Sequence, residues 1–412
     1  MVSPSDDRSL KSRSLPPFAR RAWSSALASG EFHDWKWQLA HRLTSVAAIL
    51  DLLGDDFPID PATRAAMERV GARSEVSVTP CYLALADPAD PRDPILAQVL
   101  PDPAELLVDG SPDPFREEEL EIAKGVVNRY ADRALFLLTN FCSTLCRHCM
   151  RKREWPEGDG AARQSFSRLS DSEVDVAVAA IAARPAIRDV LLSGGDPLNL
   201  APSYVGRIVR LLREKCDLDV LRIGSRVPVT LPQRIDDELL EALAPAAPIY
   251  LNTHFNHARE VTPDSAAAIG RLQRAGVIVS NQGVLMRGVN DTADDLLALS
   301  RALLKAGVRS YYLHHCDPVQ GVRHFRVALP RALELIASLG GRVTGLGIPK
   351  LMVDLPGGGG KVQADGPALR EQRGTTFVYR SPIDGRDIEV DGSEGTFAGV
   401  GSWRAASVPP TR

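Results

Sequence analysis

The feature that most constrains this fold is a regular alternation of short apolar runs and helix-like stretches after residue 133. The apolar runs lie at residues 134–138, 190–192, 220–223, 249–251, 277–279 and 311–313. The stretches between them have helical character, such as 171–183, which Ser170 and Glu173 introduce as a capping box. Strands that alternate with helices form parallel βαβ units. The sequence therefore predicts the α/β class, as a partial barrel or as an open sheet.

Polar, reactive side chains follow directly after each apolar run. They include Asn140 and Cys142, Ser193 to Asp196, Ser225 and Arg226, Asn252 and His254, Asn281 and Gln282, and His314 to Asp317. In parallel α/β folds the sites lie at the carboxyl ends of the strands. Six such ends converging on one mouth favour the barrel and predict a large composite site.

The rest of the chain divides around this central region. Apolar residues at helical spacing from Phe32 to Val70, and a helical look at 117–127, predict a helical N-terminal region over 1–130. The barrel is expected over 131–341. After about Arg342 the alternation stops, and 342–412 is expected to be a C-terminal extension that contains a glycine-rich segment. A hairpin is predicted there from 376–379 to 387–390, turning at 383–385.

Composition excludes several classes of protein. The net charge of −3 provides no general basic field for nucleic acid. No apolar run reaches the roughly 18 residues that a membrane span needs. The first residues lack the layout of a signal peptide, so we expect a cytoplasmic protein without a membrane or nucleic-acid partner.

Three of the six cysteines lie within eight residues, as Cys142-x3-Cys146-x2-Cys149. They could hold a structural zinc ion with His148 or a distant cysteine as fourth ligand, or an iron–sulfur cluster with one open iron. The absence of a second Cys-x2-Cys pair favours the cluster, and three unrelated buried thiols are a third reading. The basic residues around them, Arg147, Arg151, Lys152 and Arg153, could be a solvated or nucleic-acid-binding face, or could pair with carboxylates.

A proline, four glycines and Lys361 form the segment 356–361. It lacks the spacing and the final Ser/Thr of a phosphate-binding P-loop. Four glycines indicate a close approach or a sharp reversal of the backbone. Lys361 could form a Schiff base with a carbonyl cofactor, or could be a surface lysine.

The segment 142–149 resembles the CxxxCxxC motif of the radical S-adenosylmethionine (SAM) enzymes. Together with the PGGGGK segment at 356–361, it resembles lysine 2,3-aminomutase and its relatives, and the likeness runs from about Asp34 to Lys361. It includes the stretches 128–133, 191–196, 222–226, 252–257, 281–282 and 287–291. The combination of cluster motif and PGGGGK is far more specific than either alone.

This resemblance implies a partial (β/α)6 barrel of the radical SAM type. It also implies a [4Fe-4S] cluster on Cys142, Cys146 and Cys149, SAM on the open iron, and pyridoxal 5′-phosphate (PLP) on Lys361. The implied reaction moves the α-amino group of an amino acid to its β-carbon. An electron donor such as flavodoxin or ferredoxin and a homo-oligomer are expected with it.

The same resemblance assigns roles to further residues. Arg151 matches the ligand of the substrate α-carboxylate, and Arg129, Tyr130 and Arg133 match residues near PLP. Ser193, Gly194, Gly195 and Asp196 match the segment that meets the SAM amino group. His148, His254 and Gln282 fall at pocket positions.

Two aspartates of the lysine enzymes have counterparts here, Asp317 and Asp354. Two carboxylates in one pocket repel unless a cation lies between them, so we expect a basic substrate, with lysine first and then arginine or ornithine. His314 stands where the family often has tyrosine, which leaves the choice among these open. A protein of a different class, a zinc-binding structural or nucleic-acid-binding protein, is the alternative.

Overall fold

The computed structural model describes residues 15–57, 59–90, 92–107, 110–155, 167–395 and 403. Within these residues, the main sheet has ten strands, β1 to β10, which follow one another in chain order. Strands β3 to β9 run parallel to their neighbours. The edges are antiparallel, with β1 and β2 beside β3 at one end and β10 beside β9 at the other.

The strands confirm the predicted alternation and add to it. Their bounds are β1 (Glu121–Ala123), β2 (Val126–Tyr130), β3 (Arg133–Thr139), β4 (Asp189–Gly194), β5 (Val220–Gly224), β6 (Ile249–Thr253), β7 (Val277–Leu285), β8 (Arg309–His315), β9 (Lys350–Leu355), β10 (Gly360–Gln363), β11 (Leu369–Arg373), β12 (Thr376–Arg380) and β13 (Asp387–Asp391). The six predicted strands are β3 to β8. The alternation continues past Arg342, because β9 pairs in parallel with β8.

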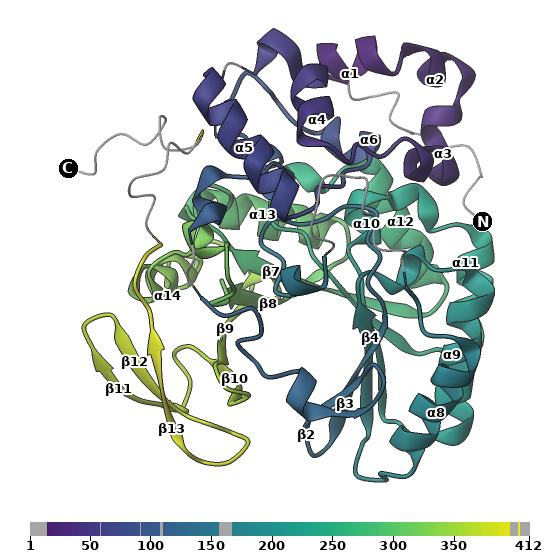
Figure 1. Cartoon of the computed structure of the whole chain (residues 1–412). Helices are drawn as coiled ribbons and strands as arrows, with labels where there is room; N and C mark the ends of the chain where they lie inside the picture. The colour runs from purple at the N-terminus through teal and green to yellow at the C-terminus, as the bar shows by residue number, and fades with distance from the viewer. Residues whose placement is uncertain are drawn as a thin grey trace.

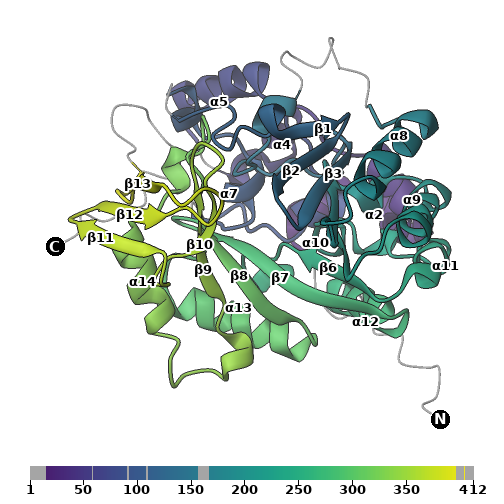
Figure 2. The same cartoon turned by 90° about the horizontal axis from the view of Figure 1, so that it is seen from below.

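Helices cover the outside of this curved sheet. Their bounds are α1 (Pro17–Ala22), α2 (Ser24–Ser29), α3 (Trp35–Ala40), α4 (Val46–Leu53), α5 (Pro61–Arg73), α6 (Pro80–Leu83), α7 (Leu96–Val99), α8 (Asp171–Ala182), α9 (Pro202–Lys215), α10 (Val227–Thr230), α11 (Asp237–Leu243), α12 (Pro263–Arg274), α13 (Ala293–Lys305) and α14 (Leu329–Ala337). Helices α8, α9, α11, α12 and α13 lie outside the curve of strands (Figure 2). The predicted capping box of α8 is present, because Ser170 and Glu173 hydrogen-bond reciprocally. The α/β class with a partial parallel barrel is confirmed.

The N-terminal helices α1 to α6 gather on one side of the sheet, at the top of Figure 1. The helices predicted between Phe32 and Val70 are confirmed as α3, α4 and α5. The helix predicted at 117–127 is wrong: a single 3-10 turn there is followed by β1 and β2. Gly125, with φ of 78°, reverses the chain between these strands, and a Cβ on it would lie 2.5 Å from the Leu137 carbonyl oxygen.

The C-terminal extension forms a separate sheet of β11, β12 and β13, drawn in yellow in Figure 1. The predicted hairpin is confirmed as β12 and β13. This sheet packs on α14 and β9 through a second hydrophobic cluster, in which Phe377, Tyr379 and Val390 join Leu329 and Leu335. The extension is therefore anchored beside the last strands of the barrel.

No helix in the described part of the chain is long and apolar enough to cross a membrane.

Candidate active site

The loop after β3 carries the thiols Cys142, Cys146 and Cys149, which are free and half-buried. Its backbone is held by the N-terminal region. The Leu145 N–H donates to the Ser77 carbonyl at 2.8 Å, and the Arg147 N–H donates to the Gln98 carbonyl at 2.9 Å. These contacts fix the loop from the N-terminal side and leave the thiols partly accessible.

The environment of these thiols differs from one to the next. Burial raises the pKa of Cys142, with the charge of Asp196 adding to it, and burial raises the pKa of Cys149 to about 12. Cys146 Sγ instead accepts a hydrogen bond from Arg226 Nη1 at 2.7 Å. Among the described residues no three His, Cys, Asp or Glu side chains form a group that could hold a single metal ion.

The Ser193-Gly194-Gly195-Asp196 segment ends β4 and lies against the cysteine loop. The Asp196 N–H donates to the Phe141 carbonyl at 2.7 Å, and a Cβ on Gly195 would lie 2.3 Å from the same oxygen. The buried Asp196 carboxylate accepts from the Ser225 hydroxyl at 2.7 Å and from the Arg226 N–H at 2.7 Å. Asp196 therefore ties the ends of β4 and β5 together beside the thiols.

The basic residues around the cysteines pair with two buried glutamates. Arg147 and Lys152 both bind Glu105, and Arg151 and Arg153 both bind Glu117. Burial opposes ionisation of Glu105 and Glu117, but these cations outweigh it and lower the pKa of each to about 2. Pairing with carboxylates is thus confirmed, and this removes the support for a nucleic-acid-binding face.

Arg151 binds one edge of its guanidinium to Glu117. Its Nε and Nη2 donate to the two Glu117 oxygens at 3.1 and 2.7 Å, a bidentate pair. A substrate carboxylate would have to displace Glu117 to bind Nε and Nη2, whereas Nη1 takes no part in this pair.

Lys361 lies directly opposite Asp354 across the β9–β10 hairpin. Its Nζ is 3.3 Å from Asp354 Oδ2 and 3.3 Å from His314 Nε2. Its backbone N–H donates to Tyr130 Oη at 2.7 Å. Because opposite residues of an antiparallel pair point to one face, the hairpin holds the amine beside the carboxylate.

The glycine turn before Lys361 serves both purposes that the sequence indicated. Gly357, Gly358 and Gly360 have φ of 65°, 75° and 87°, which favour glycine. A Cβ on Gly359 would lie 2.2 Å from Ile388 Cδ1 of β13. The turn is therefore both a reversal and a close approach to the C-terminal sheet.

The arginines on either side of Tyr130 lie differently. Arg129 Nη1 is 3.6 Å from Asp354 Oδ1, so Arg129 joins the Lys361 group. Arg133 forms an ion pair with Asp132 at 2.8 Å and lies over the Tyr130 ring at 4.5 Å. Within the described residues, the contact that links Arg133 to this group is the one with Tyr130.

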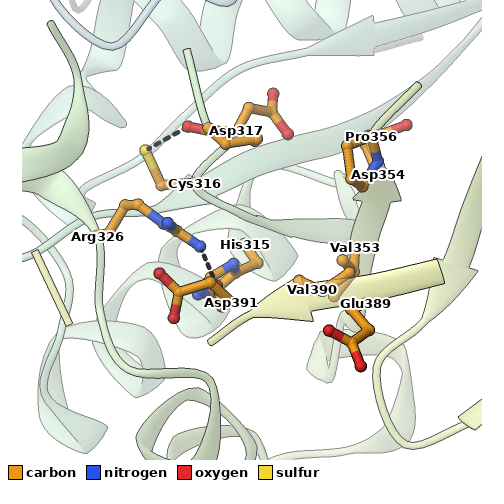
Figure 3. Close-up of a pocket in the computed structure, with 11 residues that line it drawn as sticks. His315, Cys316, Asp317, Arg326, Val353, Asp354, Pro356, Glu389, Val390 and Asp391 are labelled. Carbon is orange, nitrogen blue, oxygen red and sulfur yellow. Dashed lines mark hydrogen bonds between the residues drawn. The ribbon is translucent and has the colours of Figure 1, made fainter. Parts of the chain in front are cut away.

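Asp317 and Asp354 line one pocket of about 220 Å³ between β8, β9 and β13. Figure 3 shows both at the top of this pocket, with residues of β13 below them. Lys361 and His314 pair with Asp354, which outweighs its burial and keeps its pKa well below the usual range. Among the described residues, no cation lies within ion-pair distance of the Asp317 carboxylate; burial, together with the charge of Asp354, raises its pKa to about 8. Lys361 therefore supplies a cation to Asp354, and it acts on Asp317 only at longer range.

Of the three predicted pocket residues, His148 lies in the cysteine loop itself, whereas His254 directly follows β6 and Gln282 lies in β7. Burial and the Arg226 charge lower the pKa of His254 to about 3, with smaller effects of His314 and Lys361. Burial also lowers the pKa of His148, whose Nε2 is 3.4 Å from Asn256 Nδ2. Gln282 is half-buried on β7, beside His254. The histidines are therefore neutral at physiological pH.

Comparison with known proteins decides the family. Residues 136–301 match the radical SAM superfamily. The L-lysine 2,3-aminomutase of Clostridium subterminale is 37% identical over 370 residues, 87% of this chain and 86% of that one. That of Acetoanaerobium sticklandii is 38% identical over 339 residues, 82% of this chain and 79% of that one. The glutamate 2,3-aminomutase of Clostridioides difficile is 35% identical over 370 residues, 89% of this chain and 85% of that one.

This chain belongs to the lysine 2,3-aminomutase family. Membership implies a [4Fe-4S] cluster, SAM and PLP. The residues present fit them: three free thiols in one loop with a cation at Cys146 suit a cluster. Lys361, with an amine at hydrogen-bonding distance from neutral His314 and with Arg129 nearby, suits a phosphate-bearing aldehyde.

Residues outside the recognised motifs complete this aminomutase site. Glu105 and Glu117 hold the basic flank, and neither was singled out in the sequence because they lie more than 30 positions from their partners. Glu117 also lay in the segment taken for a helix. Arg226 and Glu260 form a buried ion pair at 2.7 Å; Arg226 falls in a stretch of family likeness, but nothing in the sequence indicated its partner.

Proposed function

We propose that this chain is an L-lysine 2,3-aminomutase, a radical SAM and PLP-dependent enzyme that moves the α-amino group of L-lysine to the β-carbon. The observation that carries the choice of substrate is the shared pocket of Asp317 and Asp354, in which Asp317 has no cationic partner among the described residues. An ammonium group on the substrate side chain would supply one. A glutamate side chain would instead bring another carboxylate to the Asp317–Asp354 pair, which already carries one negative charge at neutral pH.

In this proposal Cys142, Cys146 and Cys149 bind the cluster and Lys361 binds PLP. When bound, the cluster and SAM supply a radical that removes hydrogen, and PLP carries the migrating amino group. Tyr130 holds the Lys361 backbone through the 2.7 Å hydrogen bond, which supports its assignment to this end of the site. Arg129 and Arg133 provide positive charge for the phosphate.

The Ser193, Gly194, Gly195 and Asp196 segment is proposed to bind the SAM amino group, and its contact with the cysteine loop supports this. His148, His254 and Gln282 are proposed to line the space between SAM and Lys361. Both histidines have depressed pKa values, so they add no positive charge to a site that already holds Arg226 and Lys361.

Arg151 is proposed to bind the substrate α-carboxylate by exchanging Glu117 for it. Glu117 offers the arginine the same two-oxygen geometry that the substrate would. Arg153 would keep Glu117 paired after the exchange, because it already binds the same carboxylate at 2.9 Å.

We further propose a cytoplasmic homo-oligomer that receives its electron from a flavodoxin or a ferredoxin. We also propose that 1–130, 131–341 and 342–412 act as a helical region, a catalytic barrel and a PLP-lysine extension.

The proposal is tested by anaerobic reconstitution of the enzyme with iron, sulfide and PLP, followed by SAM, dithionite and an equimolar mixture of lysine, arginine, ornithine and glutamate. Mass spectrometry identifies any β-amino acid. We expect β-lysine as the main product. If β-arginine or β-ornithine is the product, the proposed reaction is correct but the substrate is arginine or ornithine. If β-glutamate is the product, the proposed role of the aspartates is wrong.

Two variants separate the parts of the proposal. Cys146→Ala is expected to abolish deoxyadenosine formation, and retained SAM cleavage would overturn the cluster assignment. Lys361→Ala is expected to lose the borohydride-trapped PLP adduct. An adduct on another lysine would overturn that assignment.

A further inference from the structure

We propose that Arg226 raises the reduction potential of the iron–sulfur cluster through its hydrogen bond to Cys146. This inference rests on the proposed function only in taking Cys146 as a cluster ligand. It assigns a role to the buried ion pair of Arg226 and Glu260, which binds neither the substrate nor PLP in the proposed function.

The guanidinium of Arg226 is aimed at the thiol by its remaining contacts. Nη1 is 2.7 Å from Cys146 Sγ. Nε donates to the His254 carbonyl at 3.1 Å, and Nη2 lies 2.7 Å from Glu260 Oε1 and 3.0 Å from Tyr82 Oη. The side chain is 8% exposed. With its other nitrogens held, the guanidinium has little freedom to turn away from the sulfur.

Glu260 holds Arg226 in place on the side away from Cys146 through its own hydrogen bonds. Its Oε2 accepts the backbone N–H groups of Asn256 at 2.5 Å and His257 at 2.9 Å. Its Oε1 accepts the Tyr82 hydroxyl at 2.6 Å in addition to Arg226. The carboxylate is fully buried and cannot follow a moving arginine. The network thus joins the N-terminal region, through Tyr82, to two loops of the barrel.

A positive donor at a ligand sulfur favours the reduced cluster, because the reduced cluster carries one more negative charge. Burial strengthens the effect, since salt screens buried charges far less than exposed ones. The other thiols lack such a donor in what the structure describes: Cys149 Sγ accepts the backbone N–H of Arg151 at 3.3 Å. Arg226 and Glu260 should therefore act on the potential with opposite signs.

The test is a potentiometric titration of the anaerobically reconstituted holoenzyme with dithionite, with the reduced cluster followed by electron paramagnetic resonance. We expect Arg226→Gln to shift the midpoint potential to more negative values. Glu260→Gln should shift it to more positive values, because it removes the carboxylate that offsets Arg226. A loss of folding or of cluster alone could not produce shifts of opposite sign.

The matched control is Arg222→Gln. Arg222 lies in β5, the strand that leads to Arg226, and pairs with Asp189 at 2.8 Å. Its loss should leave the midpoint potential unchanged. If Arg226→Gln takes up no cluster, Arg226→Lys, which keeps the positive charge, replaces it in the titration. Its midpoint potential should shift to more negative values by a smaller amount. Unchanged midpoint potentials in the Arg226 and Glu260 variants would overturn this inference but would leave the assignment of the cluster to the cysteines intact. An unaltered enzyme without any reducible cluster would instead overturn the proposed function.

Discussion

Asp317 and Asp354 hold their protons very differently although they share one pocket. Burial raises the pKa of Asp317 to about 8, with the charge of Asp354 as the second cause. Asp354 stays ionised because Lys361 and His314 outweigh its burial. Like charges at close range rarely ionise together. At neutral pH the empty pocket therefore carries one proton on the pair, held at Asp317.

Binding of a cationic side chain should release that proton. An ammonium group near Asp317 lowers its pKa, so below pH 8 lysine binding is coupled to proton loss and its apparent affinity rises about tenfold per pH unit. Isothermal calorimetry in two buffers of different ionisation enthalpy measures the protons released. Asp317→Asn should abolish this proton release, and an unchanged release in that variant would contradict the assignment.

The β9–β10 hairpin is the element that carries Lys361, and a side chain at Gly359 fits its turn only if Ile388 and Leu355 move. A Cβ there would meet Ile388 Cδ1 at 2.2 Å and Leu355 Cβ at 2.9 Å. At Gly358 the obstacle is different: φ is 75°, and the nearest atom would be an ordinary 3.5 Å away. Two adjacent glycines are thus needed for two separate reasons.

We expect Gly359→Ala to cost about 1–3 kcal/mol of stability through overpacking and to slow covalent capture of PLP by Lys361. Shortening Ile388 to alanine in the same chain should restore part of both losses, because it removes the clashing methyl group. Gly358→Ala should be destabilised by backbone strain and gain nothing from the change at Ile388. Urea unfolding and borohydride trapping measure the two effects. Equal rescue of both glycine variants would refute this distinction.

The elements themselves were largely predictable from the sequence. Strands β3 to β8 are apolar runs bounded by polar residues, and that pattern reflects burial on the sheet. Strand β9 was missed although residues 351–353 are buried, because the alternation was expected to stop after about Arg342. Glu117 was assigned to a helix because the apolar spacing of 117–127 was given more weight than Gly125, whose positive φ turns the chain there.

The candidate site could be predicted as residues but not as contacts. The thiols and Lys361 belong to recognisable sequence motifs. Arg151 and Arg226, in contrast, each pair with a glutamate that is 34 positions away in the sequence and is brought close by the fold. A contact between residues so far apart in the sequence is not marked by any local sequence pattern. The bidentate pair of Arg151 with Glu117 is the clearest case, since the sequence suggested pairing with a carboxylate but could not identify which one.

The molecule as a whole joins its helical N-terminal region to the catalytic loop by a buried ionic contact. Glu105 Oε1 accepts from Arg147 Nε at 3.0 Å, and Lys152 Nζ lies 2.6 Å from Glu105 Oε2. Arg147 is fully buried, and its guanidinium also stacks over the Trp155 ring at 5.3 Å. The N-terminal region is thereby part of the support of the cysteine loop.

This contact should make stability fall in acid. The pKa of Glu105 is about 2 in the folded chain, whereas it is ordinarily 4.5. The contribution of ionised Glu105 to the free energy of unfolding is therefore complete above about pH 4.5 and is lost as the pH falls toward 2. The shift corresponds to about 3 kcal/mol. Urea unfolding of the metal-free chain from pH 6 to 3 measures the loss. Glu105→Gln should be less stable at pH 6 and lose less over this range, and parallel curves would contradict the linkage.

The pairing of Lys361 with Asp354 makes the number of residues in the glycine turn as important as their kind. Side chains alternate between the two faces of a strand, so one residue inserted or deleted before Lys361 would turn its amine to the opposite face of β10. Such a change leaves the composition and every other motif intact. Within a set of related sequences, a length change in this turn therefore marks a chain in which the lysine that we propose binds PLP no longer faces Asp354, whatever its overall identity.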